Sequence, residues 1–272
     1  MDVMVRPSGA VSFFSSDGTY FTCAGACSTL GNWSAPVALN FEVLQAVVDG
    51  AGVSHALLNK GRTANGEALL GYARCASGCS TPANWQSSAL GFLTNAGLFT
   101  ASLTATDSGR LFIAYNQGVI TASTQDNQKL FVASCLGAGC LDLNTWTSFT
   151  TGVLDEGDSG AWVEASGEGV VLASNTVTEL KVTACEVDCH LAASWSQAVV
   201  VDTSAAIAQA VNPAAGTTCP TTATFAAWYP KRPIIGIGPN GVAIVHNPSP
   251  LVRCLGTNVG TLPPIGRIIT TF

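Results

Sequence analysis

Short apolar stretches, broken by glycine, asparagine, serine and threonine, run along the whole chain. Within residues 41–90, the stretches LQAVVD, GVSHALL, LLGYARC and WQSSAL are each long enough for one strand. The turn between the first two carries glycine and aspartate, which suit the positive φ angles of a tight hairpin. The apolar–polar alternation is imperfect, as expected for inner strands buried on both faces. The pattern predicts a unit of four antiparallel strands.

A Cys-Cys-Trp motif repeats four times and marks off such units. In every copy the second cysteine lies six residues before the tryptophan, and the first cysteine lies four or five residues before the second. Recurrence at a fixed spacing is the signature of a repeat architecture. The copies are YFTCAGACSTLGNW (20–33), GYARCASGCSTPANW (71–85), FVASCLGAGCLDLNTW (131–146) and KVTACEVDCHLAASW (181–195).

A second motif, a glycine turn followed by a β-rich run and a polar residue, occurs five times. A single four-stranded sheet leaves an apolar face exposed, and radial stacking of sheets covers it. We therefore predict an all-β fold, with residues 1–272 forming one domain, a five-bladed β-propeller of four-stranded antiparallel blades. The copies are SGAVSFFSS (8–16), AGVSHALLN (51–59), SGRLFIAYN (108–116), EGVVLASN (168–175) and NGVAIVHN (240–247).

The last unit departs from the repeat. PLVRC ends at Cys254, but the second cysteine and the tryptophan are missing. An insertion at 203–230 precedes this blade; it contains Cys219, and its segment TSAAIAQAV favours a short helix. We predict a disulfide between Cys219 and Cys254, and an outer strand formed by PPIGRIITTF.

The ten cysteines, an even number at regular spacing, predict an oxidising compartment and five disulfides. A short loop between two cysteines can be closed where the chain reverses between strands. Zinc, the alternative, needs four ligands, and each pair belongs to a different blade. The predicted pairs are Cys23–Cys27, Cys75–Cys79, Cys135–Cys140, Cys185–Cys189 and Cys219–Cys254.

Composition narrows the partners and the location. Only 10% of residues are charged, the net charge is −6, and the cations form no cluster, which argues against nucleic-acid binding. No apolar run approaches the roughly 20 residues of a membrane helix. The cysteines favour a secreted, extracellular or periplasmic protein. The first residues, MDVMVRPSGAV, lack an apolar signal-peptide core, so either a signal was removed or export uses another feature.

The cysteine loop followed by GNW (31–33) or ANW (83–85) resembles the sialidase-like (BNR-type) propellers of secreted bacterial proteins. The resemblance covers nearly the whole chain and implies the fold. The Asp-box of sialidases, Ser-x-Asp-x-Gly-x-x-Trp, is absent, and SSDGTYF (15–21) only echoes it. The resemblance therefore implies no catalytic residue, and the expected protein is a non-sialidase member.

Three carboxylates cluster before the fourth unit: Asp155, Glu156 and Asp158. In propellers, the loops joining one blade to the next and the loops joining second to third strands share one face. Carboxylates there suit acid–base chemistry on glycosides or calcium binding, and the alternative is a solvated acidic loop. No other cofactor is expected.

Four asparagines, Asn59, Asn116, Asn175 and Asn247, end the predicted second strands. Asparagine often ends strands because it bonds its own backbone, but a ring of amides would also suit sugar hydroxyls. Trp162, which lies outside the repeat, is a further candidate ligand contact. The repeated tryptophans, by contrast, are expected to pack between neighbouring blades.

The segment Gly157–Gly160 reads GDSG, as in trypsin-like serine proteases, and the order His55, Asp107, Ser159 mimics that family. His55 falls at an ordinary strand position, and no Ala-Ala-His-Cys segment is present. The triad requires mutual contacts that a four-residue match does not supply. A protease is therefore not favoured.

These features favour a non-catalytic, monomeric module that binds a glycan or another cell-surface polymer. The first alternative is a glycoside hydrolase that uses Asp155, Glu156, Asp158 or Asp202. The second is a propeller that binds only another protein. The loops differ greatly in length between units, which weighs against five identical sugar sites.

Overall fold

In the computed structural model, the described residues are 2–94 (except 16, 24 and 65–67), 101–117, 129–150, 161–175 and 179–203, with the strands at 234–238, 241–246, 253–254, 257–258 and 265–269. They form an all-β structure with four four-stranded antiparallel sheets. No helix among them is long and apolar enough to cross a bilayer.

The four sheets are consecutive along the chain, and each is a simple meander. We number them one to four. Sheet one holds β1 (Asp2–Val5), β2 (Val11–Phe14), β3 (Thr19–Cys23) and β4 (Val37–Ala38). Sheet two holds β5 (Glu42–Val48), β6 (Ser54–Arg62), β7 (Ala68–Cys75) and β8 (Gln86–Thr94). Sheet three holds β9 (Ser102–Ala105), β10 (Arg110–Gln117), β11 (Lys129–Leu136) and β12 (Thr147–Thr150). Sheet four holds β13 (Ala161–Ser166), β14 (Gly169–Asn175), β15 (Glu179–Cys185) and β16 (Val199–Thr203).

A fifth sheet, sheet five, contains β17 (Ile234–Gly238), β18 (Gly241–His246) and β21 (Ile265–Ile269) in that spatial order. PPIGRIITTF supplies the outermost strand of this sheet among the described residues, as predicted, but β21 pairs directly with β18 and so takes the third-strand place. Because β21 occupies that ladder, PLVRC has no place in it. Cys254 lies in β19 (Arg253–Cys254), which pairs only with β20 (Thr257–Asn258). Cys219 and most of the insertion fall outside the described residues.

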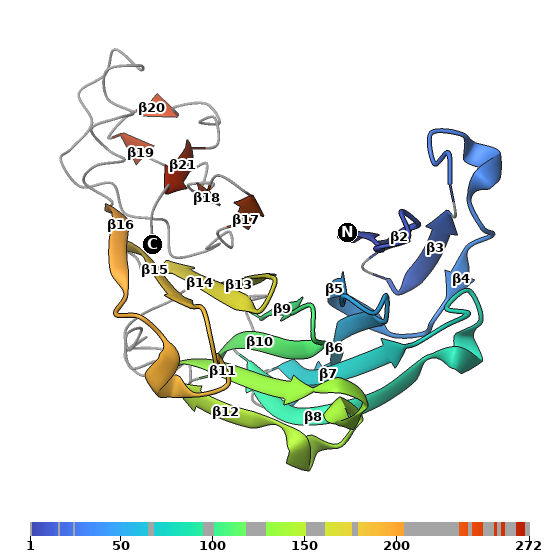
Figure 1. Cartoon of the computed structure of the whole chain (residues 1–272), viewed down its shortest axis with the longest axis horizontal. Coiled ribbons are helices and arrows are strands. Elements are labelled where there is room, and N and C mark those ends of the chain that lie inside the picture. The colour runs from blue at the N-terminus through green and yellow to red at the C-terminus, as the bar shows by residue number, and fades with distance from the viewer. Residues whose placement is uncertain are drawn as a thin grey trace.

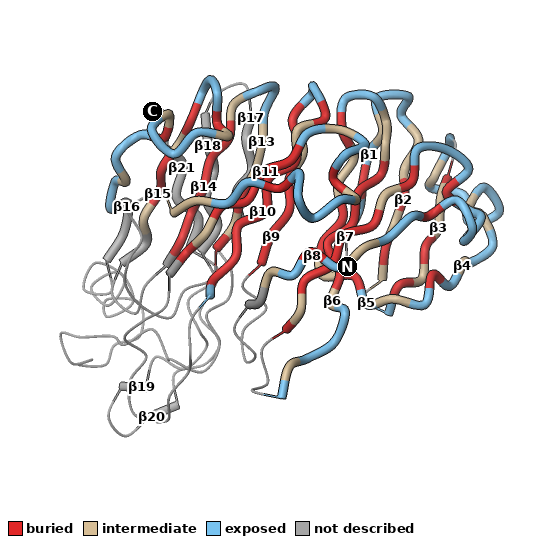
Figure 2. The backbone as a smooth tube through the Cα atoms, turned by 90° about the horizontal axis from the view of Figure 1, so that it is seen from below, coloured by how far each residue is buried: buried red, intermediate tan, exposed pale blue. Residues whose placement is uncertain are grey.

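The sheets follow one another around an arc, with β1, β5, β9, β13 and β17 on its inner side (Figure 1). Sheet one lies at one end of the arc and sheet five at the other. Buried residues concentrate along the strands and exposed ones at the strand ends and connections (Figure 2). Three apolar clusters fill the spaces between sheets one and two, two and three, and three and four. This arrangement is propeller-like.

The register makes positions in different sheets directly comparable. In each of sheets one to four, the first cysteine pairs with a residue at or near the start of the second strand. Residues that lie the same number of positions from that pair occupy equivalent rungs. The pairs are Val11↔Cys23, Ser54↔Cys75, Leu111↔Cys135 and Val170↔Cys185.

The glycine of the repeat is required by one turn that recurs in sheets one, two and three. In Asp49–Val53 the N–H of Asp49 donates to the carbonyl of Val53 at 3.1 Å, and the N–H of Gly52 donates to the carbonyl of Asp49 at 2.9 Å. Arg6–Ala10 and Thr106–Arg110 repeat both bonds. The fourth residue of each turn is glycine with φ of +80°, a backbone conformation that costs other residues energy.

Four of the five predicted disulfides are confirmed, with Cα–Cα distances of 5.5 to 5.8 Å. Each tryptophan of the motif donates its indole N–H to the carbonyl of the second cysteine, as Trp146 does to Cys140 at 2.8 Å. The rings pack on the preceding sheet: Trp85 lies 5.3 Å from Phe14 between ring centroids, and Trp146 lies 5.9 Å from Tyr72. The packing role predicted for the repeated tryptophans is confirmed for these two.

Polar side chains of two inner strands, β5 and β9, bond the backbone of the next inner strand. The N–H of Leu103 in β9 donates to Oε1 of Gln45 in β5 at 2.9 Å. The N–H groups of Val163 and Ala165 in β13 donate to Ser102 and Thr104 in β9 at 2.8 and 3.0 Å. An inner edge strand would otherwise leave these donors without partners. The bonds therefore fix the spacing of successive sheets.

Candidate functional site

Much of the predicted ligand face falls outside the described residues. This holds for the carboxylates Asp155, Glu156 and Asp158, for Asn247 and for Ser159. Asp202 lies in β16, but its side chain is not described. The candidate site is therefore built from Asn59, Asn116, the strand position of Asn175, and Trp162.

Three of the asparagines predicted to end the second strands occupy the same rung, although β6 ends at Arg62 and β10 at Gln117. Asn59, Asn116 and Asn175 each lie five residues beyond the residue that pairs with the first cysteine, and each pairs with a leucine across the sheet. The pairs are Asn59↔Leu70, Asn116↔Leu130 and Asn175↔Leu180. The structure thus brings the three backbone positions into register at one end of the sheets.

The side chains on this rung have different surroundings. Asn59 donates from Nδ2 to Oε2 of Glu42 at 2.6 Å, and its Oδ1 accepts the N–H of Gly61 at 3.0 Å. The second bond is the local one that commonly makes asparagine a strand-end residue. Asn116, in contrast, is buried. Asn59 therefore makes the local bond of the strand-end interpretation, although β6 continues past a register shift to Arg62.

Trp162 and Glu164 form a polar pair on β13. The indole N–H of Trp162 donates to Oε2 of Glu164 at 3.3 Å, and both side chains are half-buried. Ala161 and Val163 pack toward sheet three, so strand alternation places Trp162 and Glu164 on the opposite face, toward sheet five. Burial raises the pKa of Glu164 from 4.5 to about 7, against the smaller opposing effect of the indole hydrogen bond.

Sequence reasoning missed Glu164. The available signal was a single carboxylate in the inner strand AWVEAS, between residues that pack as core. A carboxyl group whose pKa lies near neutrality can donate or accept a proton at physiological pH.

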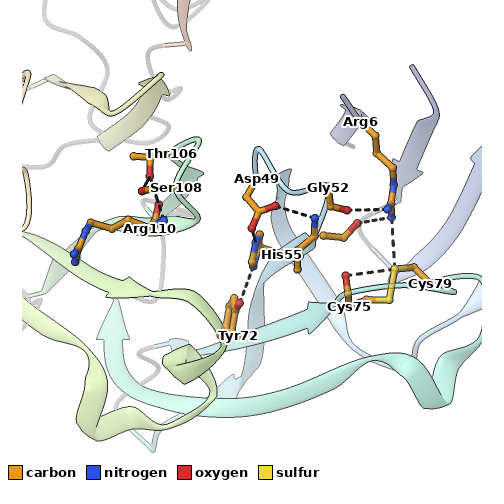
Figure 3. Close-up of polar contacts among 12 residues, drawn as sticks. Arg6, Asp49, Gly52, His55, Tyr72, Cys75, Cys79, Thr106, Ser108 and Arg110 are labelled. Atoms are coloured by element: carbon orange, nitrogen blue, oxygen red, sulfur yellow. Dashed lines mark hydrogen bonds and ion pairs between the residues drawn. A yellow bond between two sulfur atoms is a disulfide. The ribbon is translucent and has the colours of Figure 1, made fainter. Parts of the chain in front are cut away.

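A buried hydrogen-bonded chain joins Asp49, His55 and Tyr72 (Figure 3). Nδ1 of His55 lies 2.7 Å from the hydroxyl of Tyr72, and Nε2 lies 3.2 Å from Oδ2 of Asp49. Burial acts to raise the pKa of Asp49, but the hydrogen bonds from His55 and from the N–H of Val53 outweigh it, so this pKa is lowered. Burial raises the pKa of Tyr72.

This chain explains His55 without a protease. Both ring nitrogens already have protein partners, and the carboxylate on the imidazole belongs to Asp49 and not to Asp107. The side chain of Asp107 is exposed, while its N–H donates to the carbonyl of Gly167 at 3.1 Å. His55 is thus a strand residue with a structural polar network.

Further polar contacts at the same end link successive sheets through their turns (Figure 3). Arg6 donates to the carbonyl of Gly52 at 2.8 Å and to Oγ of Ser54 at 2.9 Å, which ties sheet one to sheet two. Ser108 donates from its N–H and its hydroxyl to the carboxylate of Glu168, both at 2.7 Å. The hydroxyl bond from Ser108 is the largest influence that lowers the pKa of Glu168. These residues hold sheets together.

A resident metal has no visible ligand set in the part of the chain that the structure describes. No group of three or more His, Cys, Asp or Glu side chains is placed there to hold an ion. The acidic cluster for which calcium was considered lies outside that part, so its interpretation stays a prediction.

Comparison with known proteins relates the fold to sialidases. No family model matches the chain, and no curated protein matches it. A Hadza microbial sialidase matches with a TM-score of 0.52 and 10% identity, over 90% of this chain and 49% of the sialidase chain. A thermostable family-43 glycoside hydrolase matches with a TM-score of 0.47 and 10% identity, over 90% of this chain and 82% of that one. A protein of unknown function from Dyadobacter fermentans matches with a TM-score of 0.39 and 16% identity, over 63% of this chain and 47% of that one.

The likeness to the sialidase supports a sialidase-like β-propeller fold. At 10% identity it concerns the fold alone. The matched part spans about half the length of the sialidase and of the Dyadobacter protein.

Proposed function

We propose that this chain is a secreted, five-bladed β-propeller that binds carbohydrate without cleaving it. The observation that carries the proposal is the sialidase-like fold, found here without the Asp-box. Propellers host many functions, so the carbohydrate class is suggested by the likeness to a sialidase and not by the fold itself. The four disulfides indicate an oxidising environment, which fits an extracellular module.

Three described titratable side chains are taken up by structural contacts, which favours binding over catalysis. Asp49 and His55 bond each other inside a buried network, and Glu168 bonds the neighbouring turn. These groups are engaged in structural contacts. The ligand would then be held by the loops that carry Asp155, Glu156 and Asp158 and by the rung of Asn59, Asn116, Asn175 and Asn247, with Trp162 as a stacking surface.

The second candidate function is glycoside hydrolysis, and Glu164 favours it. Its carboxyl group has a pKa raised to about 7 by burial and lies on an inner strand beside an indole ring. Glycosidases use one carboxylic acid that is protonated near neutral pH to donate to the leaving oxygen. The second carboxylate would come from the Asp155–Asp158 loop.

One experiment separates the two functions. The folded protein is screened on a broad glycan array with and without calcium, beside the variant Asp155→Ala/Asp158→Ala. Asp107→Ala, which changes an exposed aspartate at the opposite end of the sheets, is the matched control. Specific binding that the double variant loses and the control keeps supports the binding module. A blank array from folded protein contradicts it.

The glycans that bind are then incubated with the protein, and the products are analysed by mass spectrometry. Intact glycan after prolonged incubation supports the non-catalytic role. Cleavage that disappears in Glu164→Gln supports the hydrolase in its place.

A further inference from the structure

Sheets two, three and four each bury one face against the sheet before them. On the rung of Val3, the residues Ala46, Leu103 and Val163 are 6%, 0% and 0% exposed. On the rung of Phe13, the residues Ala56, Ile113 and Leu172 are fully buried. These six residues belong to the three apolar clusters between successive sheets. The rungs therefore mark the face that each sheet turns toward its predecessor.

In sheet one, no described residues cover the same face. Val3 and Val5 are each 65% exposed, and Phe13 is only half-buried. Phe21 lies on this face as well, with its ring centroid 5.9 Å from that of Phe13. We call Val3, Val5, Phe13, Phe21 and Trp33 the open face of sheet one.

The cysteine loop shows the same contrast. Trp85, Trp146 and Trp195 are 9%, 8% and 8% exposed, but Trp33 is only half-buried. Trp33 makes the same indole bond to the carbonyl of its second cysteine, at 2.9 Å. What differs is the preceding sheet, because the ring of Trp85 lies against Phe14 and Tyr20 of sheet one, at 5.3 and 5.7 Å. The open face is thus a built interface that lacks its second half.

Sheet five has the composition of that second half. Its strands IIGIG, GVAIVH and IGRII carry apolar residues or glycine at nearly every position. Continuous apolar strands are typical of sheets covered on both faces. β17 lies next to β13 of sheet four, which accounts for one face.

Size complementarity points the same way. The closing pair Gly238↔Gly241 matches Ser166↔Gly169, so counting from it aligns sheet five with sheet four. On that alignment, one rung facing the following sheet carries Gly236, Ala243 and Ile268, and the next carries Ile234, Val245 and Gly266. The glycines and the alanine on these rungs leave room for the bulky rings of Phe13 and Phe21 on the open face. Large residues against small ones fill an interface at native density.

We propose that sheet five docks on the open face of sheet one, so that the ring closes by face-to-face packing, with no strand exchanged between the two ends of the arc. The proposal rests on the five-bladed part of the proposed function, but its test reads stability and not glycan binding. A blank glycan array would therefore leave this proposal standing.

The first test introduces a charge on the open face. Val3→Asp and Phe13→Asp are compared with Leu30→Asp and Val187→Asp, which alter apolar residues that are 87% and 69% exposed elsewhere. If sheet five covers the face, the first two variants lower Tm by roughly 4–8 °C, and the controls leave it within about 1 °C of the wild type. Equal, small shifts in all four variants would overturn the proposal.

The second test exchanges size across the interface, and it remains informative if a charged variant fails to fold. Ala243→Phe alone should lower Tm by overpacking, and Phe13→Ala alone should lower it by leaving a cavity. The double variant should recover most of the loss, whereas additive losses would refute the contact. Sedimentation equilibrium gives the remaining outcome: a wild-type dimer that Val3→Asp dissociates would assign the face to a second copy, against the proposal.

Discussion

Replacing Asp49 by alanine should destabilise the protein strongly, although Asp49 lies in a turn. Its carboxylate accepts two hydrogen bonds from nearly buried groups: the N–H of Val53 at 2.8 Å from Oδ1, and Nε2 of His55 at 3.2 Å from Oδ2. Asp49 and His55 are 7% and 1% exposed, so water replaces the lost carboxylate poorly. The variant Asp49→Ala leaves a buried imidazole nitrogen and a backbone N–H without their acceptor.

The expected loss follows from those two groups. A buried donor deprived of its partner costs about 1–3 kcal/mol, so two such donors give roughly 2–6 kcal/mol in the free energy of unfolding. The equivalent rung of His55 in sheet three carries Phe112, which is fully buried. The triple variant Asp49→Ala/His55→Phe/Tyr72→Phe removes the orphaned imidazole together with the buried hydroxyl that bonds it, and should therefore recover part of the loss.

The free energy of unfolding is measured by guanidinium titration at pH 7, followed by circular dichroism. Asp107→Ala is the control, because this aspartate is exposed at the corresponding turn of sheet three, and its change should stay within about 0.5 kcal/mol. A loss below about 1 kcal/mol for Asp49→Ala, or no recovery in the triple variant, would refute the role assigned to the buried network.

Two further predictions concern a titration and a glycine. The pKa of Glu164 is about 7 in the folded state against 4.5 ordinarily, so the folded state holds this proton more tightly. The stability that the proton contributes is therefore fully present below about pH 4.5 and is lost as the pH rises through 7. Glu164→Gln should flatten this dependence by at most about 3 kcal/mol between pH 4.5 and 8, and an unchanged slope in denaturant titrations would exclude the titration of Glu164 as its cause. Gly109 and Gly52 share a φ of +80°, but a Cβ on Gly109 would lie 3.1 Å from Oδ2 of Asp49, whereas a Cβ on Gly52 would meet nothing within 4 Å. Gly109→Ala should therefore lower Tm more than Gly52→Ala does, and equal losses would show that only the backbone conformation matters.

The parts of the fold that repeat were predictable from the sequence. The fixed spacing of Cys27 and Trp33, repeated in three later units, locates the loop between third and fourth strands, and the structure closes each loop with a disulfide and an indole bond. The strands proposed for the second unit coincide with β5, β6, β7 and β8. These predictions succeed because the repeat gives several independent sequence examples of one local structure.

The contacts between sheets were not predictable in the same way. Arg6, Asp49 and Thr106 all begin the same recurring turn, yet they carry a cation, an anion and a hydroxyl. Arg6 reaches the next sheet, Asp49 binds His55 within its own sheet, and the hydroxyl of Thr106 lies 3.0 Å from that of Ser108. Since the backbone geometry is common and the side-chain partners are not, an alignment of repeats hides these contacts.

The last unit shows where reasoning from repeats stops. This unit lacks the full cysteine loop, so no repeated spacing shows which later segment pairs with β18, and the direct pairing of β21 with β18 was not predicted. β18 ends at His246 in the part of the chain that the structure describes, so the predicted alignment of Asn247 with Asn59, Asn116 and Asn175 stays a prediction. Register propagates along a hydrogen-bonded ladder, whereas strand order across a sheet depends on which apolar faces must be covered. If sheet five covers apolar faces on both sheet four and sheet one, the same contacts determine the order of its strands and the closure of the ring.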